Sequence, residues 1–216
     1  MKRIYLVRHG ESVANVEKRH GGGDTPLTEL GLQQAVFIAQ RVASFPIQKI
    51  IASSMVRAQQ TAEVIAQKLD LPIETSDLFV ETRGPSELNN KEYADPTALD
   101  AFRMLDSNYG KEGFRLSDAE VFEDHTKRAQ AALQLLTQQE AEHIVVVTHG
   151  LFLRILMAHV LLGPTPSGKE VQKIMWGMEA QNTGLTILNY EKPGYAGDMR
   201  EHPWSIFVWN DHAHLG

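Results

Sequence analysis

The chain contains no cysteine among its 216 residues. Disulfide bonds, thiolate metal sites and cysteine nucleophiles are therefore excluded. It also lacks a hydrophobic run long enough to cross a membrane, because the longest one, residues 151–162, is interrupted by Arg154 and His159. Only four apolar residues separate Arg3 from Arg8, too few for the apolar region of a signal peptide. We therefore expect a cytoplasmic protein without membrane contact.

Positive charge is also scarce. The 21 lysines and arginines are outnumbered by 27 acidic residues, which gives a formal net charge of -6. This balance argues against a broad nucleic-acid surface, since such binding needs a concentrated basic face. An anionic ligand would need a local basic pocket. With 43% hydrophobic residues the chain can bury a substantial core, and we expect one domain over residues 1–216.

Short apolar runs alternate with longer segments of helical period, which predicts an α/β fold with a mostly parallel central sheet covered by helices. Strands are expected at residues 3–7, 48–52, 72–75, 143–148, 184–189 and 205–209. Helices are expected at residues 29–42, with Thr28 as N-cap, from just beyond Ser54 to about Leu69, at residues 119–138, and from Gly150 onward.

This regular pattern fails between about residues 82 and 116, where prolines and glycines are mixed with aromatic and charged residues. A loop of this length without its own structure would be unusual in a compact domain. We therefore expect a mostly helical cap inserted over the edge of the sheet.

Basic residues follow three of the predicted strands. Arg8 and His9 follow the first, Arg57 lies just beyond the second, and His149 follows the strand at residues 143–148. If these strands are parallel and adjacent, the four side chains converge at their carboxyl ends, where open α/β sheets bind ligands. Two guanidinium groups and two imidazoles suit a phosphate dianion. Gly150 lets the backbone approach that anion, and the helix beginning there adds its positive dipole end.

His9 is the expected nucleophile, because a neutral imidazole is available near pH 7. The leaving group then needs a proton, and Glu81, directly before the cap, is the best-placed acid. Glu74 and Glu87 remain alternatives for that role. Asn15 is a further candidate donor to phosphate, although it could instead close a turn.

Motifs in most parts of the chain resemble those of the histidine phosphatase superfamily, also called the phosphoglycerate mutase-like family. In order, they are Arg8-His9-Gly10-Glu11 with Asn15, Asp24-Thr25-Pro26-Leu27-Thr28 with Gly31, Arg57-Ala58-Gln59-Gln60-Thr61-Ala62, and Thr148-His149-Gly150.

The resemblance implies a three-layer α/β/α sandwich and a phosphohistidine intermediate on His9. It places Arg8, Arg57, His149 and Asn15 around the phosphate, supports Glu81 as acid and base, and implies that neither a metal nor another cofactor is needed. It further implies a structural role for an acidic and a basic residue after the cap, Glu120 and Arg128.

The sequence lacks the Tyr-Gly-x-Leu-x-Gly-like and Trp-Arg-Arg stretches typical of phosphoglycerate mutases. We therefore expect a metal-independent phosphomonoesterase that acts on a small phosphorylated metabolite. The alternatives are a phosphoglycerate mutase-type phosphotransferase and a phosphate-binding or interaction module without turnover. For His212 and His214 we expect a structural or pocket-closing role rather than a metal site. The sequence fixes neither the substrate nor the oligomeric state.

Overall fold

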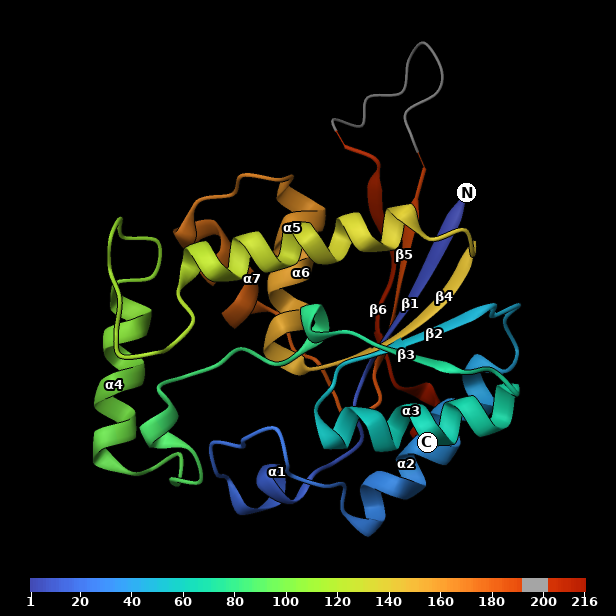
Figure 1. The fold of residues 1–216 in the computed structure, drawn as a ribbon, viewed down its shortest axis with the longest axis horizontal. Coiled ribbons are helices and arrows are strands. Elements are labelled where there is room, and N and C mark those ends of the chain that lie inside the picture. Colours follow the sequence, from blue (N-terminus) through green and yellow to red (C-terminus); the bar gives the residue numbers. More distant parts are fainter. Residues whose placement is uncertain (192–201) are drawn as a thin grey trace.

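The computed structural model describes residues 1–191 and 202–216 (Figure 1). Within them, six strands form one sheet in the order β3-β2-β4-β1-β5-β6. The pairs β3–β2, β2–β4 and β4–β1 are parallel, whereas β5 is antiparallel to both of its neighbours. The mostly parallel sheet is thus confirmed. The strands are β1 (Lys2–Arg8), β2 (Lys49–Ala52), β3 (Ile73–Thr75), β4 (His143–Thr148), β5 (Leu185–Tyr190) and β6 (Trp204–Asp211).

Helices cover both faces of the sheet, so the expected three-layer sandwich is also confirmed: α2 and α3 lie on one face, α5 and α6 on the other (Figure 1). The helices are α1 (Val13–Glu17), α2 (Glu29–Val42), α3 (Val56–Leu69), α4 (Pro96–Ser107), α5 (Phe122–Gln138), α6 (Gly150–Leu162) and α7 (Gly168–Gly177). Short 3-10 turns are η1 (Asp77–Phe79), η2 (Ser86–Leu88) and η3 (Ala213–Leu215). None of the helices within the described ranges has both the length and the apolar character that a membrane span requires.

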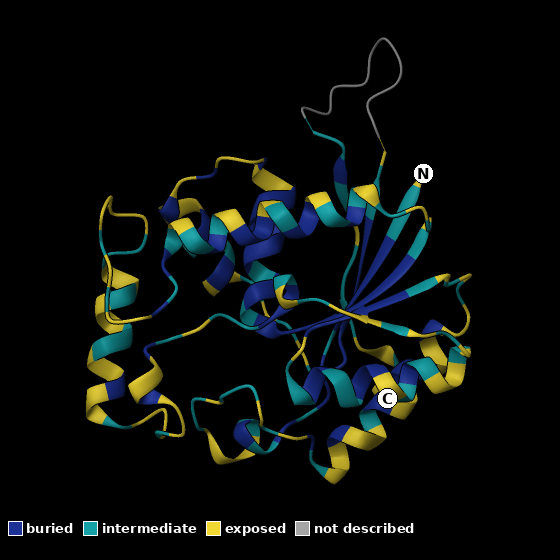
Figure 2. Cartoon of the chain, viewed as in Figure 1, coloured by how far each residue is buried: buried dark blue, intermediate teal, exposed yellow. Residues whose placement is uncertain are grey.

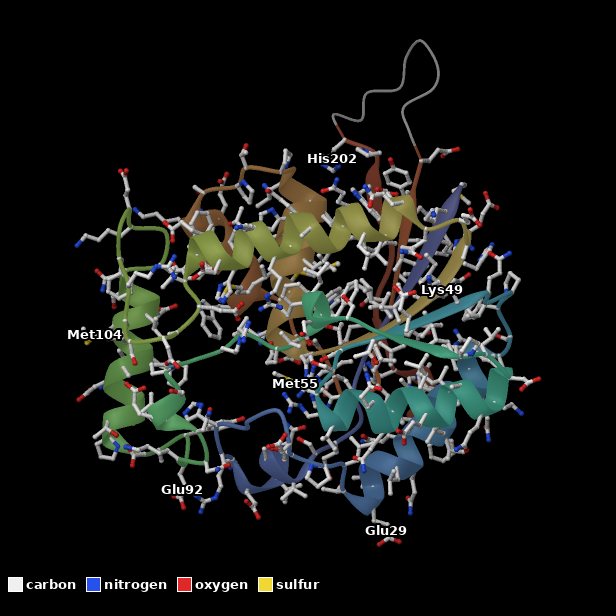
Figure 3. The ribbon with its side chains drawn as sticks, viewed as in Figure 1. Glu29, Lys49, Met55, Glu92, Met104 and His202 are labelled. Atoms are coloured by element: carbon white, nitrogen blue, oxygen red, sulfur yellow. The ribbon has the colours of Figure 1, made fainter. Side chains whose placement is uncertain are left out.

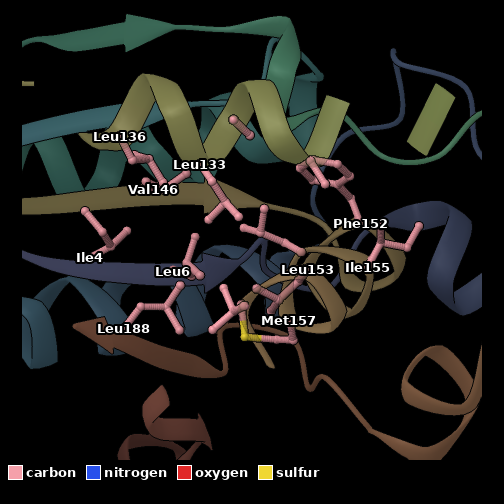
Figure 4. Packing of buried hydrophobic residues seen from close by; sticks show 14 of the residues in the cluster. Ile4, Leu6, Leu133, Leu136, Val146, Phe152, Leu153, Ile155, Met157 and Leu188 are labelled. Carbon is pink, nitrogen blue, oxygen red and sulfur yellow. The ribbon is translucent and has the colours of Figure 1, made fainter. Parts of the chain in front are cut away.

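The alternation of side chains along β1 creates two cores. Ile4 and Leu6 pack toward α5 and α6, whereas Tyr5 and Val7 pack toward α2 and α3. All four side chains are fully buried, which explains why this strand is apolar at successive positions. Figure 2 shows the buried centre of the sheet, and Figure 4 shows the first core, to which Ile4 and Leu6 of β1 and Leu153 and Met157 of α6 contribute.

The segment predicted as a mostly helical cap contains η2 and α4, whose 3 and 12 residues make up less than half of residues 82–116. Asp95 caps α4, since its Oδ1 accepts from the backbone N–H groups of Thr97 and Ala98. At the other end, Oδ1 of Asp106 accepts from Trp176 Nε1 of α7 at 2.9 Å. Figure 3 shows Met104 of α4 at the outer edge of the molecule and Met55, the N-cap of α3, near its centre.

One predicted helix boundary was wrong, and two helices were not predicted. The helix predicted over residues 119–138 begins only at Phe122, because the N–H of Glu120 donates to the carbonyl of Arg83 at 2.8 Å instead of starting a helix. The helices α1 and α7 were not expected. The start of α7 carries a capping box, Ser167 with Glu170, which is a recognisable helix signal.

Candidate active site

The carboxyl ends of three neighbouring strands bring the predicted side chains together. β4 lies between β1 and β2, so His149 after β4 lies close to His9 after β1 and to Arg57 in the first turn of α3. Nε of Arg57 donates to Nε2 of His9 at 3.1 Å, and the two imidazole centroids are 5.0 Å apart. The predicted convergence is therefore present.

The His9 ring is held in one tautomer. Its Nδ1 lies 2.6 Å from the carbonyl oxygen of Gly10, which can only accept a hydrogen bond, so Nδ1 carries the proton and Nε2 carries a lone pair. The residue is only 3% exposed. Burial, followed by the positive charges of Arg57 and Arg8, holds its pKa well below the usual histidine value. A neutral ring with an unprotonated Nε2 is the form that can attack phosphorus once the Arg57 N–H turns from Nε2 to the phosphoryl group.

Arg8 and Gly150 are packed against each other. A Cβ atom placed on Gly150 would lie 3.1 Å from Nε of Arg8, so any larger residue at position 150 would press on the guanidinium group. This Nε is buried without a hydrogen-bond partner in the described residues, whereas Nη1 donates to the carbonyl of Ala180 at 2.5 Å. Arg8 thus retains an unused donor beside the N-terminus of α6, where anions are favoured.

Arg57 is tied to two glycine-containing segments. Its Nη1 donates to the carbonyl of Gly22 at 3.0 Å. The hydroxyl of Thr61, one turn later on α3, donates to the carbonyl of Arg57 at 2.8 Å and accepts from the N–H of Gly10 at 3.1 Å. These contacts fix the guanidinium group relative to the loop after β1.

Unlike His9, His149 does not line the cavity between this cluster and the cap. It is fully buried, its Nε2 is 2.8 Å from the hydroxyl of Ser53, and its Nδ1 has no hydrogen-bond partner within the described chain. Burial and the nearby His9, Arg57 and Arg8 hold its pKa well below the usual value. Its predicted phosphate contact stays a prediction.

The carboxylate of Glu81 lies at the N-terminus of α6. Its Oε1 accepts from the N–H groups of Thr82 and Phe152, both at 2.9 Å, and its Oε2 accepts only from Leu151 at 3.1 Å. Burial lowers the pKa values of three arginines around it, Arg8, Arg57 and Arg154. The negative charge of Glu81 opposes that shift at each of them. Glu81 therefore shares one electrostatic environment with the basic cluster.

The two alternative acids lie elsewhere. Glu74 is on β3 and pairs with Lys49 at 2.6 Å, and Glu87 accepts from the hydroxyl of Ser117 at 3.0 Å. Neither lines the cavity, whereas Glu81 does. The geometry favours Glu81 over both.

Asn15 lies on α1 and faces the cavity. Its Oδ1 accepts from the N–H of Ser12 at 3.1 Å, so the side chain does close a turn. Its Nδ2 makes no hydrogen bond in the described part of the chain and remains able to donate to an anion. The two roles considered for Asn15 are thus compatible.

A cavity of about 1030 Å³ extends from this cluster to the cap. Four residues of the site were given no role from the sequence. Arg154 lines the cavity, whereas Ser53, Thr61 and Asn182 contact His149, Gly10 and His9, respectively. Arg154 lies one helical turn after Gly150, so periodicity could have placed it on the same face. Its Nε donates to the carbonyl of Gly150 and its Nη1 to that of Met175. Further cavity-lining residues include His20, Tyr93, Phe102, Leu151 and Trp176.

The two C-terminal histidines do not line this cavity. Nε2 of His214 lies 3.1 Å from the hydroxyl of Thr183, and Nδ1 of His212 lies 3.0 Å from the carbonyl of Asn210. These local contacts fit the structural role considered for the pair and not the pocket-closing one. Over residues 1–191 and 202–216, no three His, Asp or Glu side chains are grouped so that they could share a metal ion.

Comparison with known proteins links this geometry to a family. The model of the histidine phosphatase superfamily (branch 1) matches residues 4–200. A relative named probable phosphoglycerate mutase GpmB, from Yersinia pestis (strain Pestoides F), is 31% identical over 100% of this chain and 95% of its own length.

Two solved structures have a similar fold. The protein YhfR from Bacillus stearothermophilus is 26% identical, with a TM-score of 0.82 and coverage of 100% of both chains. A mycobacterial glucosyl-3-phosphoglycerate phosphatase is 24% identical, with a TM-score of 0.76 over 97% of this chain and 98% of its own. The family match covers nearly the whole sequence and agrees with the convergence of His9, Arg57 and His149. The chain belongs to the histidine phosphatase superfamily (branch 1).

Proposed function

We propose that this protein is a metal-independent phosphomonoesterase that hydrolyses a small phosphorylated metabolite through a phosphohistidine at His9. The observation that carries the proposal is the buried, neutral His9 ring, whose Nε2 faces the Arg57 guanidinium group at 3.1 Å. A nucleophile and a cation at this separation can act on the same phosphoryl group.

In the first step, the Arg57 N–H leaves Nε2 of His9 and donates to a phosphoryl oxygen instead. Nε2 then attacks phosphorus, a P–N bond forms and the bond to the ester oxygen breaks. The Nδ1 proton stays in its hydrogen bond to the carbonyl of Gly10 and stabilises the positive charge that develops on the ring. Arg8, Arg57 and the free amide nitrogen of Asn15 bind the phosphoryl oxygens. Such contacts accelerate the reaction to the extent that they tighten in the transition state.

Glu81 protonates the departing oxygen. Its Oε2 accepts one hydrogen bond, against two for Oε1, and is therefore the better site for the transferable proton. In the second step the same carboxylate takes a proton from water, the water oxygen attacks phosphorus and the P–N bond breaks. Inorganic phosphate leaves, and both His9 and the protonated Glu81 are regenerated.

Two matched substrates test this proposal. 2,4-Dinitrophenyl phosphate has a good leaving group that needs no proton, whereas phenyl phosphate has a poor one. In the presence of EDTA the wild type should release phosphate from both. Glu81→Gln should lower kcat/KM for phenyl phosphate by about 100-fold or more, the usual contribution of general acid catalysis, and leave dinitrophenyl phosphate nearly unchanged.

Equal losses on both substrates would contradict the role of Glu81. If the wild type binds phosphate but releases none from either substrate, the protein is better described as a phosphate-binding or interaction module without turnover.

A mutase-type phosphotransferase is the second candidate, favoured by the 31% identity to a probable phosphoglycerate mutase. The two activities share the first step and differ in what accepts the phosphate. A mutase passes it to a second substrate hydroxyl faster than to water. Partitioning of the phosphoenzyme between water and added phosphoglycerate therefore separates them.

A further inference from the structure

A largely buried ion pair flanks the segment that contains Glu81, and its acidic member, Glu120, lines the same cavity as Glu81. Nε and Nη2 of Arg128 on α5 donate to the two carboxylate oxygens of Glu120 at 2.9 and 2.8 Å. The two side chains are only 9% and 11% exposed. A two-pronged contact of this kind fixes the orientation of both groups as well as their separation.

This ion pair forms hydrogen bonds with the backbone both before and after Glu81. Nη1 of Arg128 donates to the carbonyl of Val80 at 2.6 Å, immediately before Glu81. Oε2 of Glu120 accepts from the N–H of Arg83 at 2.9 Å, two residues after Glu81, and the N–H of Glu120 donates back to the carbonyl of Arg83 at 2.8 Å.

Arg128 also packs against a residue whose backbone binds the Glu81 carboxylate. Its guanidinium carbon lies 4.1 Å from the ring centroid of Phe152, and the N–H of Phe152 donates to Oε1 of Glu81. The ion pair therefore contacts the backbone on either side of Glu81 and the ring of a residue whose N–H binds the Glu81 carboxylate. A pair that served only to join α5 to the sheet would not need to hold the backbone before Glu81, the backbone after it, and the ring of a residue that binds it.

We propose that Glu120 and Arg128 are positioning residues for the proton transfer by Glu81: they hold its carboxylate where it meets the leaving oxygen. This proposal rests on the proposed function, in which Glu81 is the general acid. General acid catalysis requires hydrogen-bond contact with the leaving oxygen, so a small displacement of the Glu81 backbone is costly. Attack by His9 does not use these contacts and needs no support from them.

Arg128→Lys tests the proposal, because lysine keeps the charge and loses the planar fork. We expect kcat/KM for phenyl phosphate to fall about tenfold or more, with less than about a threefold change for 2,4-dinitrophenyl phosphate, as for a misplaced acid. The ratio kcat/KM is the correct readout, since it excludes the later hydrolysis of the phosphoenzyme. Glu120→Gln should give the same pattern and provides a second variant if Arg128→Lys fails to fold.

Gln130→Ala is the matched control. Gln130 lies on α5, as Arg128 does, and its Nε2 donates to the carbonyl of Pro164 at 2.5 Å without contacting Glu120 or residues 80–83. We expect any loss of kcat/KM in this variant to be the same for both substrates. A leaving-group effect as large in Gln130→Ala as in Arg128→Lys would show a purely structural role and overturn the proposal.

The double variant separates this proposal from the proposed function. In the Glu81→Gln background, Arg128→Lys should cause no further loss on phenyl phosphate. If Glu81→Gln shows the leaving-group effect and Arg128→Lys and Glu120→Gln do not, only the positioning role is wrong. If Glu81→Gln shows none, the acid is another group, and the positioning role fails together with the role of Glu81 as acid, whereas the role of His9 is untouched.

Discussion

Replacing Gly150 by alanine should separate activity from stability. The added Cβ would lie 3.1 Å from Nε of Arg8 and 3.4 Å from its Cδ and Cζ, closer than most Cβ contacts in proteins. The guanidinium group must then move by a few tenths of an ångström. Because Gly150 is the first residue of α6 and has no left-handed backbone conformation, alanine fits its backbone and should leave the fold intact.

The expected loss of kcat/KM follows from the hydrogen bond between Arg8 and the phosphate that the substitution would disturb. A hydrogen bond to a charged group contributes about 1.5–3 kcal/mol, which corresponds to about a tenfold to 150-fold loss in kcat/KM if one phosphate contact of Arg8 is misplaced. The assay is p-nitrophenyl phosphate hydrolysis with Tm measured in parallel. Gly177→Ala, where the new Cβ would have no neighbour within 4 Å, is the control. Full activity in Gly150→Ala would refute the proposed need for close packing of Arg8 and Gly150.

Two further predictions concern buried histidines. Burial and the positive charges of Arg57 and Arg8 lower the pKa of His9. NMR of the labelled imidazole should therefore show a neutral ring at pH 6.5 in the wild type and a higher pKa in Arg57→Gln. A wild-type pKa at or above 6.5 would contradict this prediction. Burial lowers the pKa of His125 in the folded protein to about 4. Between pH 6.5 and 4 the unfolded chain therefore binds a proton at this residue that the folded protein does not bind. The contribution of neutral His125 to the free energy of unfolding is thus complete above pH 6.5 and is lost as the pH falls toward 4. Urea unfolding should show a smaller loss over this range for His125→Gln than for the wild type, whereas equal losses would argue against the assignment.

Much of the site was predictable because it is encoded locally. Arg8, His9 and His149 lie at or directly after the ends of β1 and β4, and Arg57 lies in the first turn of the helix that follows β2. The apolar pattern of these strands is clear in the sequence, and the parallel order of β2, β4 and β1 brings their carboxyl ends together. The same local signals placed α2, its N-cap Thr28 and the start of α6 at the observed residues.

The rest depends on contacts between distant parts of the chain. Ser53 and His149 are 96 positions apart, and nothing near either residue indicates that their side chains meet. The contact of Arg128 with the carbonyl of Val80 spans 48 positions and depends on how α5 packs against the segment before the cap. Short elements such as the five-residue α1 also carry too little periodicity to be recognised.

Covalent phosphorylation of His9 is the central claim, and trapping the intermediate tests it most directly. The enzyme is mixed with 2,4-dinitrophenyl phosphate, quenched in base within one turnover and digested for mass spectrometry. We expect one phosphoryl group, labile to acid, on the peptide that contains His9, and none in His9→Ala. A stoichiometric phosphoryl group on another residue, or undiminished turnover by His9→Ala, would contradict the account.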